Sequence, residues 1–112
     1  MTNLYYYKAN VIKVYDGDTI TVDIDLGIGI WLRKQSIRLY GIDAPEVRGS
    51  EKIEGKKSRD WLREKILGKE IILKTIKDKT GKYGRLLGEI WFENENINDL
   101  LVEVGMAEAA VY

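Results

Sequence analysis

Three acidic residues in two short motifs have the types and spacing that chemistry would need. Asp18 follows an Asp-Gly pair, and Asp43 and Glu46 flank the dipeptide Ala44-Pro45. Proline fixes its own backbone and favours an extended conformation for the residue before it, so Ala44 presents its carbonyl oxygen without a competing polar side chain. Asp18, Asp43 and that carbonyl would supply hard oxygen ligands, which suit Ca²⁺ or Mg²⁺ better than zinc. Glu46 could then face a water molecule.

Two arginines and a basic, aromatic segment could handle a phosphate. Arg38 precedes the acidic loop, and Arg85 follows Lys82-Tyr83-Gly84. A guanidinium group presents a planar fork that matches phosphate oxygens, and a tyrosine can stack on a base or sugar. Taken alone, each acid is more typical of a turn or a surface loop, and each arginine is more typical of a surface salt bridge. The tyrosine is almost as typical of an exposed loop without a role. Together they predict phosphodiester hydrolysis, where catalysis is mainly positioning and neutralisation of charge.

The composition excludes several other kinds of chemistry. The 112 residues include no Cys and no His, which excludes disulfides, zinc fingers, thiol nucleophiles and imidazole bases. Hydrophobic residues make up 45% of the chain, too many for a disordered tail. No run approaches the roughly 20 apolar residues that cross a bilayer, and no signal peptide is recognisable, so we expect no membrane partner. The compartment stays open.

Charge is unevenly distributed although the net charge is zero. Residues 31–90 hold sixteen Lys or Arg against nine Asp or Glu, whereas residues 91–112 hold five acids and no base. Such segregation is compatible with a basic face for a polyanion beside an acidic pocket for a cation. A mixed, solvated surface would also produce it.

The elements that must position these residues are predicted by periodicity. Residues 4–15, 70–76 and 85–92 read as strands, and alternation over 20–26 and 31–40 predicts two more. The strand over 20–26 places Asp18 on its inward side, where a carboxylate is costly unless it is paired. Helices are expected over 58–67 and 97–104, with a polar loop from residue 46 to residue 57. Five strands and two helices predict a mainly β, α+β domain over residues 1–112, a small closed barrel of the OB type.

Four stretches in order resemble the staphylococcal nuclease (thermonuclease) family. They are Val14–Thr19, Ile37–Glu46, Lys82–Arg85 and Asn98–Ala107. The resemblance implies an OB barrel with packed helices. It also implies a Ca²⁺-dependent nuclease that acts on DNA and RNA and leaves 3′-phosphate ends.

The resemblance also implies a role for each matching residue. Asp18 and Asp43 correspond to the calcium carboxylates, and Ala44 stands where the family commonly has a threonine whose carbonyl binds the ion. Glu46 matches the general base, and the remaining matches bind the substrate. The arginines that hold the scissile phosphate match Arg38 and Arg85, and the substrate-contacting positions match Lys82, Tyr83 and, less well aligned, Tyr112.

Departures from the family pattern leave alternatives open. The segment from Val47 to Gly55 is shorter than in the best-known member, and the sequence ends at Tyr112, before the family's usual C-terminal helix. We therefore expect that helix to be absent, with reduced stability or a homo-oligomeric partner covering the exposed surface. The alternative function is a non-catalytic module that binds nucleic acid or peptide, and a third is a structural barrel for subunit contacts.

Overall fold

The computed structural model describes residues 5–80 and 85–110. Five long strands and two helices dominate these residues, as the sequence predicts. The strands are β1 (Tyr6–Asp16), β2 (Thr19–Asp25), β3 (Trp31–Leu39), β5 (Glu70–Thr80) and β6 (Leu86–Phe92). The helices are α1 (Lys52–Ile66) and α2 (Ile97–Glu103). Short elements complete the list: β4 (Ile42–Asp43), a 3₁₀ turn (Gly49–Glu51), β7 (Glu95–Asn96) and β8 (Glu108–Ala109).

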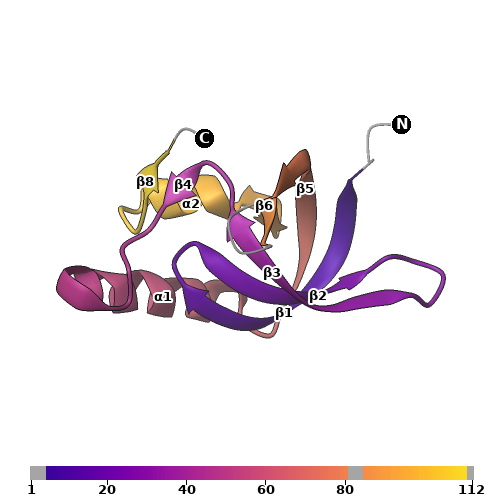
Figure 1. Ribbon diagram of the computed structural model, residues 1–112, viewed down its shortest axis with the longest axis horizontal. Helices are drawn as coiled ribbons and strands as arrows, with labels where there is room; N and C mark the ends of the chain where they lie inside the picture. The colour runs from indigo at the N-terminus through magenta and orange to yellow at the C-terminus, as the bar shows by residue number, and fades with distance from the viewer. Residues whose placement is uncertain (1–4, 81–84, 111–112) are drawn as a thin grey trace.

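The five long strands close into a barrel. Their order is β3-β2-β1-β5-β6, with antiparallel neighbours throughout, and a parallel pairing of β3 with β6 closes the ring. The closing register pairs Ile37 with Leu86 and Leu39 with Gly88. In Figure 1, α1 lies at the lower left against β1, and α2 lies above α1, beside β4, β8 and β6. This is the predicted OB-type architecture.

One core fills the barrel and extends to both helices. Alternation on β2 buries Ile20, Val22 and Ile24, and the same alternation on β3 buries Ile37 and Leu39. A helix presents one face at spacings of three and four residues, and the buried side chains of both helices follow that rule. They are Ser58, Leu62 and Ile66 on α1, and Ile97, Asn98 and Leu101 on α2.

Helix α1 begins at Lys52, so the expectation of a polar loop up to residue 57 is wrong. The sequence Lys-Ile-Glu-Gly-Lys-Lys has an exposed Ile53, a glycine and no helix cap, so it resembles a loop. Gly55 is nevertheless buried in the first turns of this helix. Packing against the acidic loop, rather than intrinsic preference, therefore sets the start of α1.

A second, two-stranded sheet lies at the end of the barrel near α2. It pairs Ile42 with Ala109 and Asp43 with Glu108, and Ala110 N donates to Gly41 O at 2.8 Å. Two residues are too few for alternation to reveal, so the sequence did not predict this sheet. The pairing holds Asp43 at a fixed place just before the Ala44-Pro45 dipeptide. Neither described helix is long and apolar enough to span a membrane.

Candidate functional site

The turn between β1 and β2 buries two carboxylates. Asp16 ends β1, Asp18 precedes β2, and each is only 6% exposed. Asp16 Oδ1 accepts a hydrogen bond from the backbone N–H of Asp18 at 3.1 Å, which closes the turn. The inward position that strand parity predicts for Asp18 is therefore the observed one, and its carboxylate needs partners.

The acidic loop folds back and supplies one of those partners. The backbone N–H of Ala44 donates to Asp18 Oδ2 at 2.8 Å, joining residues 26 positions apart. Gly17 permits this approach, because a Cβ there would lie 2.8 Å from Ala44 Cβ and 2.9 Å from Ser58 Cβ. The turn, the loop and α1 thus meet at contacts that a larger side chain at position 17 would break.

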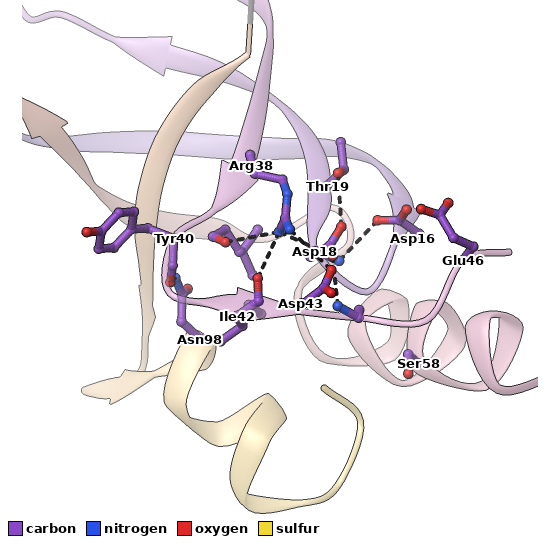
Figure 2. Close-up of polar contacts among 12 residues, drawn as sticks. Asp16, Asp18, Thr19, Arg38, Tyr40, Ile42, Asp43, Glu46, Ser58 and Asn98 are labelled. Carbon is purple, nitrogen blue, oxygen red and sulfur yellow. Dashed lines mark hydrogen bonds and ion pairs between the residues drawn. The ribbon is translucent and has the colours of Figure 1, made fainter. Parts of the chain in front are cut away.

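Arg38 supplies the second partner and links the two acidic motifs. Its Nη1 lies 3.2 Å from Asp18 Oδ2, and its Nη2 lies 3.4 Å from Asp43 Oδ1 (Figure 2). The guanidinium also donates to the carbonyl oxygens of Leu39 and Ile42, at 3.2 and 3.1 Å. The Arg38 and Asp18 side chains are only 14% and 8% exposed, so loss of Arg38 would leave the Asp18 carboxylate as a buried charge without its ion-pair partner.

Thr19 connects Arg85 to the same cluster. The Thr19 hydroxyl donates to Asp18 Oδ1 at 3.2 Å and accepts from Arg85 Nη1 at 3.3 Å. Arg85 stands immediately before β6, and the β3–β6 pairing that closes the barrel brings this end of β6 beside the site. Two arginines distant in the sequence thereby reach one buried carboxylate, Arg38 directly and Arg85 through a hydroxyl.

Negative charge exceeds positive charge on the Asp16 side of the cluster. Burial, then the adjacent Asp18 carboxyl, and more weakly the charge of Glu46 raise the pKa of Asp16 to about 7. In Figure 2 the Glu46 carboxylate lies beside Asp16, away from Arg38. Because the ionised form of Asp16 is disfavoured by burial and by neighbouring acids, a positive charge placed nearby would stabilise it.

The oxygen donors at the site fit a hard divalent cation in kind. Asp16, Asp18 and Asp43 offer carboxylate oxygens, which Ca²⁺ and Mg²⁺ prefer, and a cation near Asp16 would favour the ionised form of this carboxyl. Within residues 5–80 and 85–110, however, no three acidic side chains are grouped as a metal site would group them. The side chain of Asp43 is 69% exposed and is turned toward Arg38.

A cavity of about 240 Å³ adjoins the acidic loop. It is lined by residues 43–46 of the loop, by Glu51, and by residues 105–108 after α2. Glu46 therefore borders both this cavity and the Asp16 carboxyl, with room for solvent or a ligand beside it.

The structure brings together most of the predicted site residues. Asp18, Arg38, Asp43 and Ala44 are in direct contact, Arg85 joins through Thr19, and Glu46 lies at the edge beside Asp16. The predicted substrate residues Lys82, Tyr83 and Tyr112 lie outside the described residues.

Sequence reasoning missed two residues that shape the site. Asp16 reads in the sequence only as part of a turn, although an Asp-Gly-Asp triplet places two carboxylates at one place. Asn98 is 2% exposed and holds the backbone just before the acidic loop. Its Nδ2 donates to Tyr40 O at 2.9 Å and to Gly88 O at 3.0 Å, and its Oδ1 accepts from Ile90 N at 3.1 Å. The sequence feature that could have indicated its role is the position of this polar amide next to Ile97, the first residue of the apolar stripe of α2.

Comparison with known proteins finds a family and several relatives. A family model described as staphylococcal nuclease homologue matches residues 36–112, more than half of the chain. The chain is 33% identical over 115 residues to a protein named thermonuclease from Staphylococcus hyicus, an alignment that covers all of this chain and 64% of that protein.

Two further relatives carry related names. The thermonuclease of Staphylococcus intermedius is 30% identical over 103 residues, covering 89% of this chain and 58% of the relative. Endonuclease YhcR of Bacillus subtilis is 33% identical over 111 residues, covering 90% of this chain but only 9% of that protein. The chain thus spans less than two thirds of the length of these relatives.

Proposed function

Because this chain belongs to the staphylococcal nuclease family, we propose that it is a nuclease that hydrolyses phosphodiester bonds of DNA and RNA with the help of Ca²⁺ and leaves 3′-phosphate ends. The observation that carries the proposal is the contact of Asp18 with Arg38, with the Ala44 amide and, through Thr19, with Arg85. Acids and arginines from four separate segments meet at one place, as hydrolysis of a phosphodiester requires.

Asp18, Asp43 and the Ala44 carbonyl would hold the calcium ion. When bound there, the ion supplies Lewis-acid polarisation of a phosphate oxygen. The Arg38 guanidinium lies 3.2 and 3.4 Å from oxygens of Asp18 and Asp43, so it would meet a phosphate that binds beside these two carboxylates. Its two-point fork suits two phosphoryl oxygens.

Glu46 would accept the proton of the attacking water. The water oxygen bonds to phosphorus as the bond from phosphorus to the 5′-oxygen breaks. The leaving 5′-oxygen takes a proton from solvent, and the phosphate stays on the 3′ side. The cavity beside Glu46 leaves room for that water. Arg38 and Arg85 would stabilise the charge that grows on the phosphoryl oxygens, and Lys82, Tyr83 and Tyr112 would contact the rest of the substrate.

Cleavage of end-labelled denatured DNA and of RNA tests this function. We expect fragments in Ca²⁺ that a 3′-phosphatase shifts on a sequencing gel, and intact substrate in a chelator. Parallel incubations with Mg²⁺ identify the metal. Nucleic acid that is bound but left intact in every metal would replace the proposal with the non-catalytic binding module.

A further inference from the structure

Gly55 occupies an unusual place for a glycine, the buried face of the first turns of helix α1. Glycine destabilises a helix interior relative to alanine, because it loses more conformational freedom on folding. Gly55 has no backbone conformation that only glycine can adopt, since it lies within a regular helix. Its missing side chain, rather than its backbone, is therefore the property to explain.

The backbone of Glu46 fills the space where a side chain at position 55 would stand. A Cβ there would overlap the carbonyl oxygen and carbon of Glu46, and it would lie 2.7 Å from Val47 N. No rotamer change relieves such a contact, because the obstructing atoms are main chain. An added methyl group must push the Glu46–Val47 peptide away from α1 or push α1 away from the barrel.

The same stretch of loop is fixed at two more points. Before Glu46, Ala44 is held by its hydrogen bond to Asp18 and by contact with Gly17. The backbone N–H of Glu46 donates to Glu51 Oε1 at 3.3 Å, just before α1. Since the loop is anchored on both sides of this peptide, its contact with Gly55 sets the distance of Glu46 from the Asp16–Asp18 turn. Figure 2 shows the resulting position, with Glu46 on the loop above α1 and beside Asp16.

We propose that Gly55 is a positioning residue for Glu46, in that its bare Cα lets the Glu46 backbone lie directly on α1 and so places the Glu46 carboxylate where it acts. The inference rests on the proposed nuclease function. It assigns part of the rate to a helix residue that touches neither substrate nor metal.

The first test is Gly55→Ala in the full chain. A displacement of about 1 Å in a reacting group can cost on the order of a hundredfold in rate. We expect kcat on denatured DNA to fall ten- to a hundredfold while KM changes less than threefold. The control is Ile24→Ala, which removes a buried core side chain at the end of β2 that lies away from Asp18. The control should lose stability and keep kcat within threefold. A Gly55→Ala enzyme as fast as this control would overturn the proposal.

A double-mutant cycle with Glu46→Gln separates positioning from general damage. If Gly55 acts through Glu46, adding Gly55→Ala to Glu46→Gln lowers kcat less than threefold further, because the group being positioned is already inactive. Independent, multiplicative losses would contradict the proposal, since they would mean that Gly55 acts elsewhere.

A variant that relaxes the loop keeps the test informative if Gly55→Ala does not fold. Two glycines inserted after Gly49, which is exposed, lengthen the loop and let the Glu46 peptide move aside. With this insertion, the Gly55→Ala variant should fold and still be at least tenfold slower than the insertion alone; equal rates refute the proposal. Amide NMR shifts of Glu46 and Val47 provide a readout without catalysis. If the parent chain cuts nothing, the nuclease function fails, and these shifts still decide whether Gly55 places the Glu46 backbone.

Discussion

Removing the Asn98 side chain should destabilise the protein far more than removing any neighbouring amide. Asn98→Ala deletes three hydrogen bonds, of 2.9, 3.0 and 3.1 Å, from a residue that is 2% exposed. Each such bond contributes about 0.5 to 1.5 kcal/mol, and an orphaned buried group costs more. We expect a loss of about 3 kcal/mol or more, a large part of the 5 to 15 kcal/mol typical of a domain.

Asn96→Ala is the matched control. Asn96 caps the same helix, where its Oδ1 accepts from Asp99 N at 3.1 Å, and loss of a helix cap costs about 1 kcal/mol. Urea titrations followed by circular dichroism measure both variants, and Asn98→Ala should lower the midpoint at least twice as far as Asn96→Ala. Equal midpoints would refute the reasoning, because they would mean that the hydrogen bonds of Asn98 to Tyr40, Gly88 and Ile90 contribute nothing beyond helix capping.

Three further predictions concern the charges and the close contacts of the site. In chelator, Arg38→Met should destabilise by about 3 kcal/mol or more because it strands the buried Asp18, whereas Arg33→Met at an exposed pair should change the urea midpoint little. Folding raises the pKa of Asp16 from its ordinary value of about 4 to about 7, so the stability of the metal-free protein should fall as the pH rises through that interval. Melting temperatures measured in chelator test this, and the same decline in Asp16→Asn would contradict it. Gly17→Ala should lower both stability and cleavage rate, because its Cβ would collide with Ala44 and Ser58, and an unchanged melting curve would exclude that collision.

The barrel was predictable because alternating strands leave a strong signal. Ile20, Val22 and Ile24 alternate with polar residues, and the structure buries all three. The start of α1 was not predictable in this way, because glycine has a low helix preference and lowers the signal of the first turns. The contact between Gly55 and the Glu46 backbone, which accommodates only a glycine, is a property of the folded structure. The β4–β8 sheet was not predictable either, because it consists of only two residue pairs whose members lie more than sixty positions apart in the sequence.

The candidate site was predictable as a set of residue types but not as a network. Strand parity placed Asp18 inward, and the structure agrees. No pattern in the sequence could indicate that Arg38 would pair with Asp18 and Asp43 at once, or that Thr19 would join Arg85 to them, since these contacts depend on barrel closure. The elevated pKa of Asp16 has the same origin, because burial and a neighbouring carboxyl are properties of the folded turn.

The most direct test of the central claim compares single-turnover cleavage of denatured DNA in Ca²⁺ by the parent chain, by Arg85→Ala and by Arg33→Ala. Arg85 reaches the Asp18 cluster through Thr19, whereas Arg33 pairs with Asp23 at an exposed surface. We predict that the parent cleaves, that Arg33→Ala cleaves within threefold of the parent, and that Arg85→Ala is slower by about a hundredfold or more, as expected for loss of one transition-state contact. Equal rates for the two arginine variants would contradict the account.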